Sequence, residues 1–174
     1  MNRLFQSGLT VALVLAFLVL AFGASAAAAQ SSSTTTTTAG TTASPVGMWR
    51  QIDDETGRAR SIIEIYQHDD ELRGRIVEIL QPGDKAKRNS AGKVICTTCE
   101  GDRHNQPVEG MVILKGLKKD GEEWKGGTIF DPSRGKQYNA KMELVSPDRL
   151  EVRGYIGFSF VGRTQTWHRA KERK

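Results

Sequence analysis

The sequence has few of the residues and none of the motifs from which most catalytic or metal-binding sites are built. Its 174 residues include two cysteines and three histidines, and the histidines are scattered along the chain. No H-E-x-x-H, G-x-S-x-G, Walker or G-x-G-x-x-G pattern is present. We therefore expect a protein that is not an enzyme and that uses neither a metal nor a cofactor.

Long apolar runs are also scarce. The longest, residues 9–22, has 14 residues, whereas a membrane-spanning helix needs roughly 20. It follows the positively charged Arg3 and precedes small residues with A-x-A patterns, which is typical of a secretory signal peptide. We expect residues 1–29 to be this signal peptide. The mature chain would then lie in the periplasm or be secreted, without a transmembrane segment.

The rest of the chain divides by composition. Residues 30–44 are mostly Ser and Thr, which predicts a disordered linker because such a segment buries little apolar area. Residues 45–174 have ordinary globular composition and predict one domain. The formal net charge is +5. This charge could attract an anionic envelope component as a partner, and the alternative is that the basic side chains of the long loop are simply solvated. Nucleic acid is not expected as a partner, because the protein is exported and has no motif that combines aromatic and basic residues.

Hydrophobic residues in the predicted domain recur with period two, which indicates strands rather than helices. Residues 136–145 show this well, because Tyr138, Ala140, Met142 and Leu144 alternate with polar side chains. Turn residues separate the runs, and a long polar loop covers residues 81–108. The predicted strands are residues 47–53, 60–67, 71–80, 110–118, 123–130, 136–145, 149–155 and 160–169.

Eight strands joined mostly by short turns predict an all-β, antiparallel, up-and-down barrel. An open sheet of this length would leave exposed edges, and closure removes them. A β-sandwich is the alternative, but it usually needs longer connections. An eight-stranded barrel is either filled by its own side chains or holds one small ligand, and the sequence leaves both alternatives open.

The first predicted strand opens with Gly47-Met48-Trp49, and this G-x-W pattern resembles the lipocalin superfamily. In that superfamily the tryptophan packs at the closed end of the barrel against an arginine of the last strand. The resemblance assigns Trp49 and Arg169 to this barrel-closing pair, with Arg163 as the other arginine of the last strand. A guanidinium stacks well on an indole face.

The chain also has characteristic longer segments at residues 45–57, 96–99, 105–111, 126–132, 153–157 and 162–167. Together they resemble the secreted bacterial family catalogued as domain of unknown function 2147. The resemblance implies an exported protein with a lipocalin-like barrel, and it implies no reaction. The chain ends five residues after Arg169, so we expect none of the C-terminal helix of ordinary lipocalins.

The only cysteines, Cys96 and Cys99, lie in the long loop. In an exported protein an even number of cysteines favours a disulfide, which here would hold the loop in shape. Two alternatives remain: a redox-active C-x-x-C pair, and a zinc site completed by His104, for which a fourth ligand is not evident.

Ligand-binding candidates come from the strands expected to face the barrel interior. Trp124, Tyr138, Met142, Phe158 and Phe160 could line an apolar pocket or simply fill the barrel. In the last strand either Phe160 and its alternate neighbours face inward, or the set with Arg163 and Gln165 does. In the second arrangement Arg163 and Gln165 could bind a ligand carboxylate.

The sequence therefore predicts an exported protein that binds an apolar or lipid-like small molecule. If Arg163 faces inward, this molecule would also carry an acidic head group. One alternative is a structural or protein-interaction module that uses the disulfide-linked loop 81–108. A second alternative is a thiol redox protein that uses the cysteine pair.

Overall fold

The computed structural model describes residues 43–54 and 56–171. The predicted signal peptide and residues 30–42 of the predicted linker lie outside the described residues. Eight long strands and one long loop make up the described part, in which no helix is long and apolar enough to cross a bilayer. The strands are β1 (Gly47–Ile52), β2 (Ala59–His68), β3 (Glu71–Ile79), β6 (Val112–Asp120), β7 (Glu123–Asp131), β8 (Lys136–Ser146), β9 (Arg149–Tyr155) and β10 (Gly162–Arg169).

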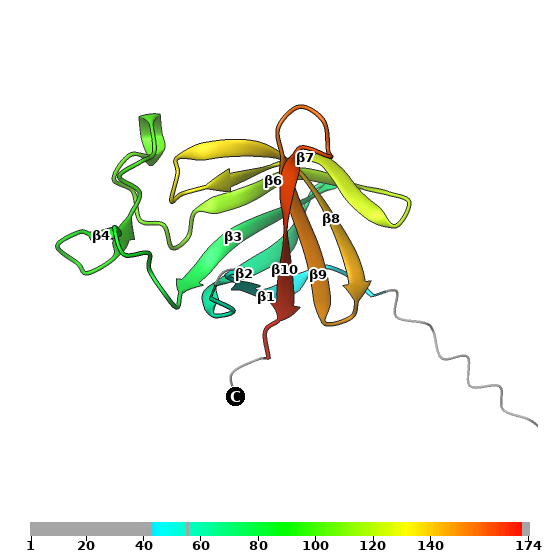
Figure 1. Cartoon of the computed structure of the whole chain (residues 1–174), viewed down its shortest axis with the longest axis horizontal. Helices are drawn as coiled ribbons and strands as arrows, with labels where there is room; N and C mark the ends of the chain where they lie inside the picture. Colours follow the sequence, from blue (N-terminus) through cyan, green and yellow to red (C-terminus); the bar gives the residue numbers. More distant parts are fainter. Residues whose placement is uncertain (1–42, 55, 172–174) are drawn as a thin grey trace, which may run out of the picture. The chain divides into compact units, whose positions relative to one another are not determined.

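These strands close into one antiparallel barrel in the order β1-β10-β9-β8-β7-β6-β3-β2 (Figure 1). Each strand pairs with its neighbour along the chain, and β1 and β10 complete the ring with Trp49 opposite Arg169. The predicted all-β, up-and-down, eight-stranded barrel is thus confirmed. Because the ring is closed, no barrel strand presents a free edge.

The strands form where apolar and polar side chains alternate. In β2, Ser61, Ile63 and Ile65 are buried, and the residues between them are partly exposed. The turn from β2 to β3 is tight, and Asp69 takes a left-handed φ of 53° there, a conformation that Asp tolerates better than most residues. Period-two patterning together with turn chemistry therefore sets the register of this hairpin.

Every barrel strand contributes to one continuous apolar core. Its largest fully buried members, Trp49 and Trp167, come from the two strands that close the ring. Side chains therefore occupy the middle of the barrel. The other buried apolar residues of the strands are Ile63, Ile65, Leu72, Ile76, Ile113, Leu114, Leu117, Trp124, Phe130, Ala140, Met142, Leu150 and Val152.

The meander gives the barrel two ends with different connections. One, called here the Pro45 end, holds the start of β1, the end of β10 and the turns after β2, β6 and β8. The other, called the loop end, holds the turns after β1, β7 and β9 and the long connection from β3 to β6. Residues at the two ends are separated by the filled core.

The long connection between β3 and β6 contains secondary structure, whereas the sequence predicts only a polar loop there. It contains a two-stranded sheet of β4 (Lys87–Arg88) and β5 (Val94–Ile95) and the short 3-10 helix η1 (Gly101–Arg103). Cys96 and Cys99 form the predicted disulfide, with their Cα atoms 5.4 Å apart, and both residues are buried.

The disulfide-containing segment packs on the turn after β7. Thr98 donates a hydrogen bond from its hydroxyl to the Pro132 carbonyl over 2.7 Å. The guanidinium of Arg103 lies 4.3 Å from the centre of the Phe130 ring. At Gly135, whose φ is +65°, a Cβ atom would come within 2.0 Å of the Thr98 carbonyl oxygen. Only glycine fits at this position, because the backbone of the loop packs directly against the turn after β7.

Candidate functional site

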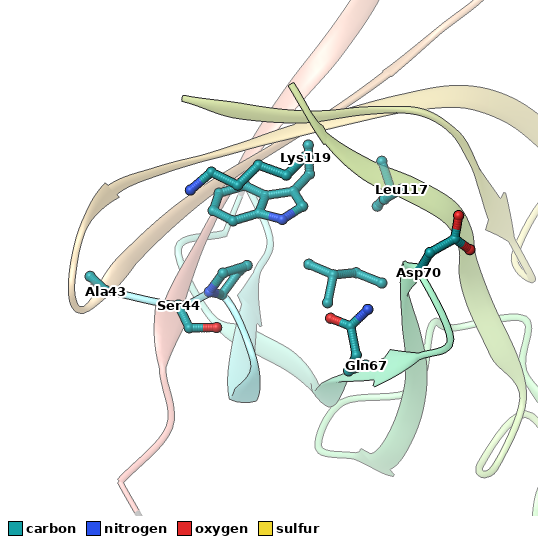
Figure 2. A pocket seen from close by; sticks show the side chains of 9 residues that line it. Ala43, Ser44, Gln67, Asp70, Leu117 and Lys119 are labelled. Carbon is teal, nitrogen blue, oxygen red and sulfur yellow. The ribbon is translucent and has the colours of Figure 1, made fainter. Parts of the chain in front are cut away.

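A pocket of about 320 Å³ opens at the Pro45 end of the barrel (Figure 2). The N-terminal segment, the β2–β3 turn and the β6–β7 hairpin surround it. Four of its residues, Pro45, Leu72, Leu117 and Trp124, are buried and apolar, and the others are exposed. The lining residues are Ala43, Ser44, Pro45, Gln67, Asp70, Leu72, Leu117, Lys119 and Trp124.

Leu72, Leu117 and Trp124 form the apolar part of the pocket. All three belong to the core, and Trp124 keeps 8% of its surface accessible. They lie on β3, β6 and β7, which are neighbours in the ring. The pocket is therefore the place where the filled core reaches solvent, and it offers an aromatic face together with aliphatic side chains.

One cation of the pocket has no carboxylate beside it. The Lys119 ammonium lies 4.7 Å from the centre of the Trp124 ring, and no carboxylate in the described part of the chain pairs with it. Figure 2 shows its side chain across the pocket from Gln67. A cation held over an indole face can also attract an anion that enters the same space.

The acidic residue that lines the pocket, Asp70, is already paired with a cation. The Asp70 carboxylate accepts a hydrogen bond from the Lys118 ammonium over 2.5 Å. This hydrogen bond lowers the pKa of Asp70 and raises the pKa of Lys118 from their ordinary values, and the attraction of the two charges acts in the same direction. Both groups are thus charged at neutral pH and compensate each other, which leaves the charge of Lys119 uncompensated.

The Pro45 wall of the pocket is held by the barrel-closing residues. The Trp49 indole donates a hydrogen bond to the Pro45 carbonyl over 2.7 Å. The Arg169 guanidinium lies 4.2 Å from the centre of the Trp49 ring and donates to the carbonyls of Ser44, Val46 and Pro147. The structure therefore places Arg169, and not Arg163, against Trp49.

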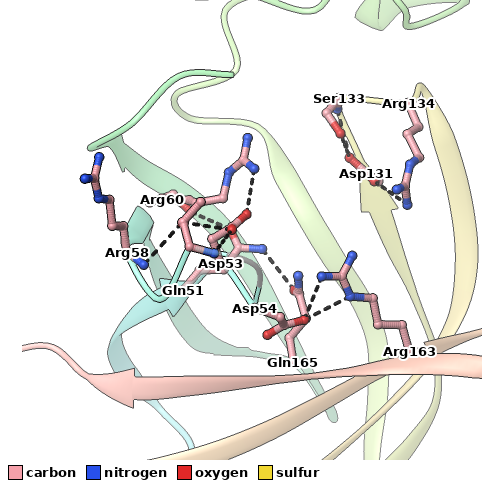
Figure 3. A network of polar contacts seen from close by, with 12 residues as sticks. Gln51, Asp53, Asp54, Arg58, Arg60, Asp131, Ser133, Arg134, Arg163 and Gln165 are labelled. Carbon is pink, nitrogen blue, oxygen red and sulfur yellow. Dashed lines mark hydrogen bonds and ion pairs between the residues drawn. The ribbon is translucent and has the colours of Figure 1, made fainter. Parts of the chain in front are cut away.

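The interior of the barrel is polar at the loop end (Figure 3). Gln51 donates to Gln165 over 3.0 Å and accepts a hydrogen bond from the buried Ser61 over 2.7 Å. Arg163 donates to the Asp54 carboxylate over 2.9 Å. Because Trp167 is buried on β10, the face with Arg163 and Gln165 is the inward one, but protein groups engage both side chains.

The structure does not gather the five ligand-binding candidates in one site. Trp124 lines the pocket at the Pro45 end, whereas Arg163 and Gln165 lie at the loop end. Met142 is buried in the core, and Tyr138 is half-buried on β8.

The prediction that Phe158 and Phe160 face the interior is wrong. Both are more than 70% exposed and precede β10, which begins at Gly162 and not at residue 160. The local sequence does not show that the β9–β10 turn extends to Val161.

Sequence reasoning also missed most of the pocket. Leu117 and Lys119 are two residues apart on β6, so they share one face of that strand. A lysine on the inward face at the end of a strand can indicate a binding pocket. The run of Lys118, Lys119 and Asp120 hides it, because it looks like an ordinary polar turn.

Asp53 ties together the β1–β2 turn at the loop end. Its carboxylate accepts hydrogen bonds from the Thr56 amide and hydroxyl, over 2.8 and 2.9 Å, and from the Arg60 guanidinium over 2.8 Å. The Arg60 hydrogen bond is the largest cause that lowers the pKa of Asp53 well below its usual range, followed by those from Thr56. Folding therefore favours the ionised carboxylate.

Asp53→Asn is expected to lower the midpoint of thermal unfolding by several degrees at pH 7. A lowered pKa in the folded state stabilises the protein above the unfolded pKa of about 4, and this contribution is lost as the pH falls further. The difference between wild type and variant should therefore shrink below about pH 4. Thermal scans from pH 7 to pH 2 measure it, and a constant difference would contradict the assignment.

The alternatives built on the cysteines receive no geometric support. Both cysteine sulfur atoms are joined in the disulfide, and the His104 Nδ1 atom lies 2.9 Å from the Cys99 carbonyl oxygen. Among the described residues, no three His, Cys, Asp or Glu side chains are placed to hold a metal ion. Cys96 and Cys99 are at most 3% exposed as a disulfide, which gives an external thiol little access.

Comparisons with known proteins agree with this architecture. A solved structure described as protein HP1028 from the human pathogen Helicobacter pylori, which belongs to the lipocalin family, superposes with a TM-score of 0.62 at 22% identity. The match covers 75% of this chain and 86% of the other. The comparison with curated proteins gave no match. Residues 47–169 match the family described as "Uncharacterized protein conserved in bacteria (DUF2147)", which spans the whole barrel. The chain therefore belongs to the DUF2147 family.

Proposed function

We propose that this protein binds a small amphiphilic anion, a molecule with an apolar or aromatic body and one acidic head group, in the pocket at the Pro45 end. The observation that supports this most is the uncompensated Lys119 ammonium over Trp124. A lipocalin-like barrel is also a fold that suits small-molecule binding in general. The body of the ligand would contact Trp124, Leu72 and Leu117, and its head group would meet Lys119.

The size of the pocket restricts the ligand. A volume of about 320 Å³ lies at the lower limit of the roughly 300–1,000 Å³ usual for small-molecule sites. The core of the barrel contains the fully buried Trp49, Ile65 and Leu114, so a long acyl chain cannot extend through the barrel. A single aromatic ring system or a medium-length chain fits the available space.

Lys119→Gln is expected to weaken binding of an anionic probe at least about tenfold, because a hydrogen bond to a charged group contributes about 1.5–3 kcal/mol. Titration calorimetry with decanoate measures this, and the same titration with decanol provides an uncharged probe of equal length. Binding of decanol should change by less than about twofold.

Lys115→Gln is the matched control, since it removes the same charge from an exposed position of the same strand that does not line the pocket. If both variants weaken decanoate binding equally, net charge and not the pocket attracts the probe. Wild-type protein that binds neither decanoate nor an aromatic sulfonate would refute the proposed function.

We also propose that the protein acts after export, in the periplasm or outside the cell. The disulfide supports this, because disulfides persist in oxidising compartments, and so does the leader-like pattern of residues 1–29. Mass spectrometry of the protein from its own cells tests the proposal. An N-terminus that retains residues 1–29 in a cytoplasmic fraction would contradict it.

A further inference from the structure

The connection between β9 and β10 holds four large apolar side chains out in solvent. Within residues 156–161, Ile156 is 66% exposed, Phe158 73%, Phe160 77% and Val161 53%. This connection is the orange loop at the top of Figure 1. Other exposed apolar residues of the described chain, such as Val77 and Val145, are below 45% and are not grouped in this way. A concentration of exposed apolar surface on one loop usually marks an interaction site.

The loop has a defined shape. Arg153 donates hydrogen bonds from its guanidinium to the carbonyls of Ser159 and Phe160 and to the Thr164 hydroxyl, over 2.6–3.1 Å. Backbone hydrogen bonds join Ile156 to Val161 and Val161 to Phe158. The rings of Phe158 and Phe160 stack with their centres 5.6 Å apart. The hydrogen bonds from Arg153 thus fix the backbone of the loop. The side chains of Phe158 and Phe160 therefore stay in solvent and do not fold back onto the barrel.

The charge around this loop follows a simple pattern. Residues 154–162 contain no charged side chain, and Arg153 and Arg163 lie immediately on either side. Arg163 is paired with Asp54, whereas Arg153 has no carboxylate partner among the residues that the structure describes. An apolar, aromatic tip beside a cation matches the boundary of a bilayer, where aromatic rings enter the headgroup region and arginine meets anionic headgroups.

We propose that the β9–β10 loop docks the protein on an anionic lipid surface, with Phe158 and Phe160 inserted among the headgroups. The area of the patch favours lipid over a folded protein partner. Two phenylalanines bury about 150–250 Å² each, and even with Ile156 and Val161 the patch is smaller than the roughly 800 Å² per partner of a stable protein interface. A narrow apolar tip can insert into lipid without a matching surface.

The location of the loop separates this activity from the proposed small-molecule site. The loop lies at the loop end of the barrel, where Gly162 pairs with Tyr155, whereas the pocket lies at the Pro45 end. Docking would leave the pocket facing away from the lipid. A change in the loop should therefore affect lipid binding and leave ligand binding unchanged.

The experiment is a vesicle flotation assay with the protein in the form that its own cells produce. One set of vesicles contains phosphatidylcholine alone, and the other contains equal amounts of phosphatidylcholine and phosphatidylglycerol. We expect wild-type protein to bind the mixed vesicles about fivefold more strongly, given about 1 kcal/mol for each basic residue at an anionic surface. The double variant Phe158→Ser/Phe160→Ser should lose at least about tenfold in partitioning, because it removes two apolar anchors. Val77→Ser/Val145→Ser is the matched control and should bind like wild type.

Two further measurements keep the test specific. A Phe160→Trp variant should show fluorescence quenching by brominated lipids beyond that of the three native tryptophans, which are at most 8% exposed. The thermal midpoint and decanoate binding of the double variant should match those of wild type. The proposal is overturned if wild-type protein ignores both vesicles, if the double variant binds them normally, or if sedimentation shows that the loop holds two copies of the chain together instead.

Discussion

Trp49→Ala is expected to remove about 3–5 kcal/mol from the free energy of unfolding, the usual cost of truncating a buried tryptophan. Domains of this size have roughly 5–15 kcal/mol in total, so much of the population would be unfolded at modest denaturant concentrations. The side chain is fully buried, and β1 and β10 meet around it. Urea unfolding followed by circular dichroism measures the loss.

Two milder variants separate the contributions of this residue. Trp49→Phe keeps an aromatic ring beneath Arg169 but leaves the Pro45 carbonyl without its 2.7 Å hydrogen bond, which should cost about 1–3 kcal/mol. Arg169→Met keeps an apolar stem over the indole and removes the donors to three carbonyls. If Trp49→Ala costs less than about 1 kcal/mol, backbone pairing of β1 with β10 closes the barrel without help from the tryptophan.

The sequence was a good guide to the barrel because period-two patterning is a local property. The alternation of buried Ile63 and Ile65 with partly exposed neighbours defines β2 without reference to any other strand. The closure of the barrel could be predicted from the number of strands and from the lack of long crossover connections. The same reasoning placed strand ends to within one or two residues wherever a Gly or Asp turn followed the strand.

The ends of the barrel were harder to predict, because side-chain alternation does not show where a strand stops. Phe160 continues the alternation of β10 but lies in a turn, held by the hydrogen bonds that Arg153 donates to the loop. Lys119 is the opposite case. In the sequence it looks like part of a polar turn, but its side chain reaches the pocket above Trp124. Both depend on contacts between separate strands, which a single sequence does not reveal.

The candidate site could accordingly be predicted only in part. Trp124 was identified because it is aromatic and faces inward. Leu72 and Gln67 come from the β2–β3 hairpin, and the closed ring brings this hairpin beside the β6–β7 hairpin. That neighbourhood arises because β3 pairs with β6 across the long loop of residues 80–111.

Gly127→Ala is expected to cost about 3 kcal/mol or more, the upper range for inserting volume into a packed site. A Cβ atom at this position would lie 2.3 Å from the Lys115 carbonyl oxygen and 2.8 Å from the Leu117 amide nitrogen. Both are backbone atoms of β6, so the strand itself must move. Chemical denaturation measures the loss of stability.

The adjacent Gly126 offers a matched control, because a Cβ atom there meets nothing within 4 Å but its φ is +79°. Gly126→Ala should therefore cost only the conformational strain, about 1–2 kcal/mol. The two variants also differ in function: displacing β6 moves Leu117 and Lys119, so Gly127→Ala should lose decanoate binding under conditions where it is still folded. Gly126→Ala should retain it. Equal effects of the two substitutions would mean that β6 tolerates the added methyl group and that the pocket does not depend on the close approach of β6 and β7.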